Sequence, residues 1–166
     1  MKKKAKIVFA FFFAAVLAWA LVFCFIPVLI IETEYGIYKW MFVNKGTQFS
    51  LKFIHSVELT PVIENFVITG SKTIKLQSIE YQSFGAGLPF SQEDGVFYQD
   101  GDKFIIKGMN REFKTIEFLI YPDNKLTFIF NDKQDYLYEK LSNSSFVRFK
   151  IKALSVYFIK KYLTIT

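Results

Sequence analysis

The chain's only histidine lies in a short polar stretch, FIHSVELTPVIENF, at residues 53–66. His55 could act as a general base if the carboxylate of Glu64 oriented its imidazole ring. A tight turn at residues 58–61 would pair the flanking strands and set His55 directly opposite Glu64. Because side chains alternate along a strand, Ser56 would then point to the other face. The two neighbours His55 and Ser56 are therefore not expected to form a base and nucleophile pair.

Three interpretations of the pair formed by His55 and Glu64 stay open. A partly buried pair could fix the register of the hairpin, since an unpaired buried charge is very costly. The pair could instead bind a ligand or partner, or it could catalyse a hydrolysis. Metal binding is not indicated, because one histidine and no suitable carboxylate spacing do not fit a zinc or calcium site. No cofactor is predicted.

A second polar stretch, SFGAGLP at residues 83–89, contains two glycines that could serve only as a structural bend or could let backbone N–H groups form an anion-binding nest. The motifs of a phosphate loop and of a nucleophile elbow are both absent around it. Further along the chain, Arg111 could clamp a carboxylate or form an ordinary surface ion pair. The residues predicted to bind a ligand or partner are His55, Ser56, Glu64, Ser83, Gly85, Gly87 and Arg111.

The elements that must position these residues are predicted to be strands. Residues 32–166 contain ten segments rich in aromatic and β-branched residues, separated by turn-forming residues. These segments are 36–43, 47–57, 62–69, 73–82, 96–99, 103–107, 115–121, 125–130, 135–141 and 146–152. Asp123-Asn124 predicts a hairpin between two of them, 115–121 and 125–130. Short, regularly spaced strands favour an all-β fold, either an antiparallel β-sandwich or a barrel-like domain.

Residues 1–31 are predicted to be a membrane anchor that precedes this domain. The 25 residues from Ile7 to Ile31 carry no charge, and a bilayer core needs about 20 helical residues. Lysines precede the run and glutamates follow it, which predicts one transmembrane helix in the cytoplasmic membrane with residues 32–166 outside the cytoplasm. A cleaved signal peptide, or a lipoprotein signal ending at Cys24, are the alternatives. The run is longer than the apolar region of a usual signal peptide and lacks a small-residue cleavage site.

The charge of the chain belongs mostly to its N-terminus. The formal net charge is +6, from 21 basic and 15 acidic residues, and four of the lysines lie within the first six residues. Without them 17 basic residues face 15 acidic ones, so a nucleic-acid partner is not indicated. The only cysteine, Cys24, lies in the apolar run, and the β domain therefore has no disulfide or thiol chemistry.

Together, the two polar stretches resemble an uncharacterised bacterial family called domain of unknown function eighteen-fifty. The resemblance covers roughly residues 36–125, and it is carried by His55-Ser56-Val57, Thr60-Pro61-Val62, Glu64, residues 83–89 and Asn110-Arg111. It implies a small exported or anchored β domain, often encoded beside TRAP transporters of the TAXI type. Such transporters move small organic acids with an external solute-binding protein. The implied partners are a TRAP permease or its solute-binding protein.

The sequence therefore predicts a membrane-anchored accessory or binding domain, associated with a TRAP-type organic acid transporter, rather than an enzyme. One alternative is an envelope hydrolase that uses His55 with Glu64. Another is a purely structural envelope protein.

Overall fold

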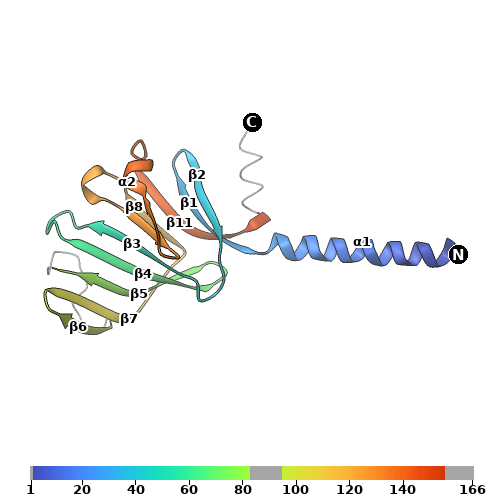
Figure 1. Ribbon diagram of the computed structural model, residues 1–166, viewed down its shortest axis with the longest axis horizontal. Coiled ribbons are helices and arrows are strands. Elements are labelled where there is room, and N and C mark those ends of the chain that lie inside the picture. Colours follow the sequence, from blue (N-terminus) through green and yellow to red (C-terminus); the bar gives the residue numbers. More distant parts are fainter. Residues whose placement is uncertain (1, 83–94, 156–166) are drawn as a thin grey trace.

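The computed structural model describes residues 2–82 and 95–155 (Figure 1). Helix α1 (Lys2–Cys24) projects from a domain made of two antiparallel sheets. The smaller sheet has the strand order β2-β1-β11-β8, and the larger has the order β10-β9-β3-β4-β5-β7-β6. Within the described residues neither sheet closes on itself. The prediction of an all-β antiparallel domain is therefore confirmed, and its barrel-like alternative does not fit two open sheets.

The strands are short and follow the turn residues of the sequence. The four-stranded sheet contains β1 (Pro27–Thr33), β2 (Gly36–Phe42), β8 (Thr115–Leu119) and β11 (Phe146–Ala153). The seven-stranded sheet contains β3 (Gln48–Ile54), β4 (Pro61–Gly70), β5 (Thr73–Tyr81), β6 (Val96–Asp100), β7 (Lys103–Phe113), β9 (Thr127–Phe130) and β10 (Lys133–Tyr136). The strand predicted at 135–141 is only partly correct, because Leu137–Lys140 form the short helix α2.

One hydrophobic core lies between the two sheets. Strand β11 shows why, because its buried Val147 and Phe149 alternate with polar residues along the strand. The ring of Phe149 lies 6.2 Å from that of Phe49 on β3, in the opposite sheet. Nearer the end of β8, the rings of Phe53 and Phe118 lie 5.2 Å apart. Aromatic contacts across the two layers therefore hold the sheets face to face.

Strand β1 corrects the predicted boundary between anchor and domain. It begins at Pro27, so the last five residues of the apolar run belong to the β domain. The strand lies between β2 and β11 and is buried on both faces. Leu29 and Ile31 point into the main core, while Val28 and Ile30 form a second, smaller cluster on the other face. A strand buried on both faces has no alternation, which makes it look like a continuation of the apolar helix.

Helix α1 exposes large apolar side chains along its described length. Phe9 and Trp19 are each 71% exposed, and Ile7 is 55% exposed. Among the described residues, no helix combines the length and the apolar character that a membrane span requires.

The prediction of a hairpin around Asp123-Asn124 was wrong. Its two flanking strands belong to different sheets, since β8 pairs with β11 and β9 pairs with β3 and β10. A short 3-10 turn, Pro122–Asn124, makes the crossing. The buried Asn124 side chain donates a hydrogen bond to the carbonyl of Leu119 at 2.7 Å and accepts one from the N–H of Leu126 at 3.2 Å. These bonds satisfy backbone groups at a corner between two layers, where no ladder can form.

Candidate functional site

The polar stretch around His55 forms a hairpin, but its register differs from the predicted one. Glu64 on β4 lies opposite Leu51 of β3, and His55 lies just beyond the end of β3. The predicted pair of His55 and Glu64 was therefore wrong. The loop occupies residues 55–60 instead of the tighter turn expected at 58–61. The observed partner of Glu64, Leu51, lies four positions before the predicted partner, His55. Because a shift by an even number of residues keeps each side chain on the same face, the prediction that Glu64 lies on the core-facing side of the hairpin is confirmed.

His55 stabilises this loop through its own ring. Its Nδ1 atom accepts hydrogen bonds from the backbone N–H groups of Val57 and Glu58, each at 3.3 Å. The backbone of His55 also bonds to Thr60 and Leu59, at 2.9 and 3.0 Å. The side chain acts here as a cap for the turn, much as an Asx side chain does.

Glu64 lies in an otherwise apolar row of side chains. Its direct neighbours across the strands are Leu51 and Ile79, both buried. Burial raises the pKa of the Glu64 carboxyl from its ordinary 4.5 to about 7, and the positive charge of Arg111 opposes part of that shift. Arg111 on β7 lies opposite the buried Leu76 of β5, which places Arg111 on the same side of the sheet as Glu64. Glu64 and Arg111, two of the predicted binding residues, therefore interact electrostatically. A third, Ser56, is exposed on the loop.

The glycine-containing stretch, with Ser83, Gly85 and Gly87, lies outside the described residues. Its starting point is nevertheless defined, because Val62 pairs with Tyr81 across β4 and β5. Pro61 and Gln82 line one hollow of about 170 Å³. Pro61, within the first polar stretch, and Gln82, which precedes the second one, therefore lie at the same end of the seven-stranded sheet.

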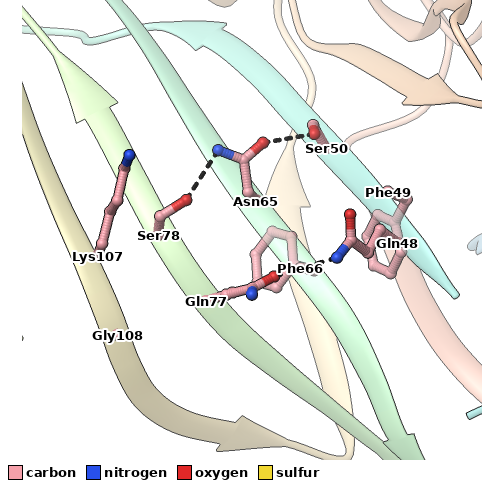
Figure 2. Close-up of a pocket in the computed structure, with 9 residues that line it drawn as sticks. All are labelled: Gln48, Phe49, Ser50, Asn65, Phe66, Gln77, Ser78, Lys107 and Gly108. Carbon is pink, nitrogen blue, oxygen red and sulfur yellow. Dashed lines mark hydrogen bonds between the residues drawn. The ribbon is translucent and has the colours of Figure 1, made fainter. Parts of the chain in front are cut away.

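The outer face of this sheet, away from the core, carries a continuous polar row. Ser50, Asn65, Ser78 and Lys107 are direct cross-strand neighbours on β3, β4, β5 and β7. The Ser50 hydroxyl donates to the Asn65 Oδ1 atom at 2.6 Å, and the Asn65 Nδ2 atom donates to Ser78 at 3.0 Å (Figure 2). We call these four residues the outer-face row. Its hydrogen bonds fix the Asn65 amide in one orientation.

Irregular pairing hollows the sheet at this row. The register shifts between Asn65 and Phe66 and again between Leu76 and Ser78, so two β-bulges lie side by side. Gly108, next to Lys107, has a φ of +75° and carries no side chain that could fill the space. A hollow of about 370 Å³ results. It is lined by Gln48, Phe49, Ser50, Asn65, Phe66, Gln77, Ser78, Lys107 and Gly108 (Figure 2).

Charge around the outer-face row is mostly positive. Lys107 lies in the row itself, and Lys52 and Lys103 line the smaller hollow beside it. Glu80 is the acidic residue that shares this smaller hollow, and its carboxylate accepts a hydrogen bond from Asn65 at 3.2 Å. Lysines beside amides and hydroxyls suit a small anion with further polar groups. In the described parts of the chain, no group of His, Cys, Asp and Glu side chains could hold a metal ion.

The sequence analysis missed the outer-face row: none of its four residues was among the predicted site residues. A signal was present in the sequence, since Ser50, Asn65 and Ser78 are uncharged polar residues in the middle of apolar strands. Joining them, however, required the register between four strands and two bulges.

The fold and the site together define a class of protein: an open, two-sheet antiparallel β domain that follows a helix and carries a hollowed polar face. Within this class, the chain belongs to the family described as "Domain of unknown function (DUF1850)", whose profile matches residues 49–137. The matched region starts in β3 and ends at the first residue of α2, so it contains nearly all of the seven-stranded sheet. No curated protein and no solved structure matches the chain.

Proposed function

We propose that this chain is a membrane-anchored domain outside the cytoplasm that binds small organic acids and assists a TRAP-type transporter. The observation that carries the binding part is the outer-face row with Lys107 in its hollow. This row lies within the residues matched by the family, on strands β3 to β7. The transporter association rests on the resemblance to the family, because its members are often encoded beside such transporters.

The anchoring part rests on the N-terminal segment. Lysines at the start of the chain are followed by an uncharged run. The described large apolar side chains of α1 are exposed, and the helix projects away from the β domain (Figure 1). An exposed apolar helix next to a lysine-rich end suits a single-pass anchor with a cytoplasmic N-terminus.

The hydrolase alternative has lost its geometric basis. It required Glu64 to orient His55, but these residues are not paired and His55 uses its Nδ1 atom within its own loop. The remaining alternative, a purely structural envelope protein, predicts no ligand at the outer-face row.

Binding can be tested on the full chain in detergent micelles, by isothermal titration with a panel of mono- and dicarboxylates. We expect saturable binding of at least one acid and a clear loss of affinity in the Lys107→Gln variant. The matched control is Lys72→Gln, which removes an exposed lysine from the turn between β4 and β5. Equal affinity in both variants, or no binding by the unaltered chain, would contradict the binding proposal.

The transporter association needs a separate experiment. A tagged full chain is recovered from native membranes in mild detergent, and its partners are identified by mass spectrometry. We expect a TRAP permease subunit or its solute-binding protein, enriched over a control membrane protein with the same tag. Recovery of neither would contradict the association without affecting the binding result.

A further inference from the structure

The β domain is attached to α1 by a very short connection. The helix ends at Cys24 and β1 begins at Pro27. Even fully extended, this connection spans at most about 11 Å. It is also fixed in place, because the carbonyl of Ile26 accepts a hydrogen bond from the N–H of Leu154 at 2.9 Å. The domain therefore cannot move far from the end of the helix.

Several chain segments meet at this end of the four-stranded sheet. Strand β1 starts here, β2 ends here, and β11 ends here. The N–H of Val43, just after β2, donates to the carbonyl of Pro27 at 3.2 Å. Phe25, between the helix and the strand, is 74% exposed. The outer side of this sheet therefore begins close to the end of α1.

That outer side has an unusual composition. Two successive cross-strand rows each contain an aromatic residue on β2, an aliphatic residue on β1 and a lysine on β11. We call these rows the aromatic–lysine face, and its residues are Phe42, Val28, Lys152, Trp40, Ile30 and Lys150. The aliphatic residues are buried, Phe42 is 53% exposed, and the rings of Trp40 and Phe42 meet edge to face at 5.2 Å. The row of Phe42 is the one nearer to α1.

We propose that the aromatic–lysine face lies in the lipid headgroup layer, so that the β domain is seated on the bilayer instead of hanging from it on a tether. This inference rests on the proposed anchoring by α1. Tryptophan and other aromatic rings are favoured at the boundary between headgroups and acyl chains, and lysines are attracted to anionic headgroups. The short connection keeps both rows within reach of the headgroups.

The face lies outside the residues shared with the family. The matched region begins after β1 and β2 and ends before β11. The seat on the membrane is therefore a property of this chain's small sheet, while the outer-face row belongs to the large one. Lys150 also forms an ion pair with the buried Glu32, which lies two positions after Ile30 on the same face of β1. This pair fixes the position of Lys150 and balances its charge, so Lys152 is the lysine of the face that we expect to contact anionic headgroups.

The chain contains two tryptophans, which makes the proposal testable by fluorescence quenching. The full chain is reconstituted in vesicles of phosphatidylcholine with a minor part of phosphatidylglycerol. In the Trp19→Phe variant, the emission of Trp40 should be lost when some of the lipids carry a nitroxide on the headgroup. Trp19 lies about 7–8 Å from the end of α1 along the helix axis. In the Trp40→Phe variant, lipids brominated in their acyl chains should therefore quench the emission of Trp19.

A third variant supplies the matched control. Tyr35 lies between β1 and β2 at the opposite end of this strand pair and is 76% exposed. A Tyr35→Trp substitution, made with both natural tryptophans changed to Phe, should keep its emission with headgroup nitroxides. Circular dichroism of each variant shows whether the β domain is intact.

The possible outcomes separate this proposal from the anchoring that it needs. Quenching of Trp40 by headgroup nitroxides, with Trp19 quenched in the acyl region and the Tyr35→Trp reporter bright, supports the seat. Quenching of Trp19 without quenching of Trp40 overturns the seat and leaves the anchor intact. Equal quenching at positions 40 and 35 overturns the proposed orientation of the domain. An unquenched Trp19 overturns the anchor and the seat together.

Discussion

At the scale of single residues, Glu64 stands out because its ionisable carboxyl lies among apolar side chains. A carboxylate between Leu51 and Ile79 loses most of its hydration. Its pKa rises to about 7, so the folded protein binds a proton there more tightly than the unfolded chain does. Proton binding at Glu64 therefore stabilises the folded state. This contribution to the free energy of unfolding is complete below about pH 4.5 and is lost as the pH rises through 7.

The change Glu64→Gln should remove this dependence on pH. Gln stays neutral, so the variant should be more stable than the unaltered chain at pH 8, by up to about 3 kcal/mol, and nearly equal to it at pH 4. Urea unfolding in detergent, followed by circular dichroism at several pH values, measures the difference. Glu112→Gln, on an exposed position of β7, is the control. A constant difference between Glu64→Gln and the unaltered chain across this range would contradict the assigned cause.

His55 shows what the sequence could and could not provide at this scale. The composition of its stretch correctly predicted a hairpin, and the alternation correctly put Glu64 on the core side. The partner of His55 could not be predicted, because the loop is longer than a tight turn and Leu59 adopts a left-handed backbone with a φ of 54°. A loop that a histidine ring closes by accepting backbone hydrogen bonds has no simple sequence signature.

At the scale of elements, one buried carboxylate connects the two sheets. Asp135 on β10 accepts hydrogen bonds from Tyr38 at 3.1 Å and Lys39 at 2.8 Å, both on β2, and from Lys140 of α2 at 2.6 Å. Burial alone would raise the pKa of Asp135, but the hydrogen bonds and charges of the lysines outweigh it and lower the pKa below its ordinary 3.8. The cluster therefore holds β2, β10 and α2 together as a charged clasp.

The change Asp135→Asn should loosen this clasp by about 1–2 kcal/mol at neutral pH, since both lysines are half exposed and partly screened. A lowered pKa contributes stability above the unfolded value, and this contribution is lost as the pH falls through the folded value. The gap between the variant and the unaltered chain should thus shrink only below about pH 4. Thermal unfolding across pH measures it.

Asp132→Asn is the matched control for the clasp. Asp132 is exposed in the turn between β9 and β10 and has a φ of 60°, which Asn tolerates well. Similar losses of stability in both variants would show that Asp135 is only a general contributor to the fold and would contradict a clasp between the sheets.

The elements themselves were largely predictable, for a physical reason. Strands with one face in the core alternate, as in β11, and turn residues mark their ends. Strand β1 was missed because it is buried on both faces and follows directly after an apolar helix. The corner at Pro122–Asn124 was misread because a turn that reverses a hairpin and a turn that changes sheets use the same residues. The outer-face row depends on the register of four strands and on the two bulges between them, which composition does not encode.

At the scale of the whole molecule, the two sheets divide the proposed roles. The large sheet carries most of the residues matched by the family and the polar hollow with Lys107. The small sheet joins α1 and carries the aromatic–lysine face. Because the outer faces of two packed sheets point in opposite directions, a domain seated through its small sheet would leave the polar hollow open to the solvent or to a partner.

The orientation of the whole chain gives the last prediction. The lysines at the start of the sequence should keep the N-terminus in the cytoplasm and place both sheets outside. In a Cys24→Ser background, Ser71→Cys in the exposed turn after β4 should react with a membrane-impermeant maleimide in intact spheroplasts. Lys6→Cys, in the first turns of α1, should react only after the membrane is permeabilised. The reverse pattern would invert the proposed topology, and labelling of both positions without permeabilisation would contradict an anchor that crosses the membrane.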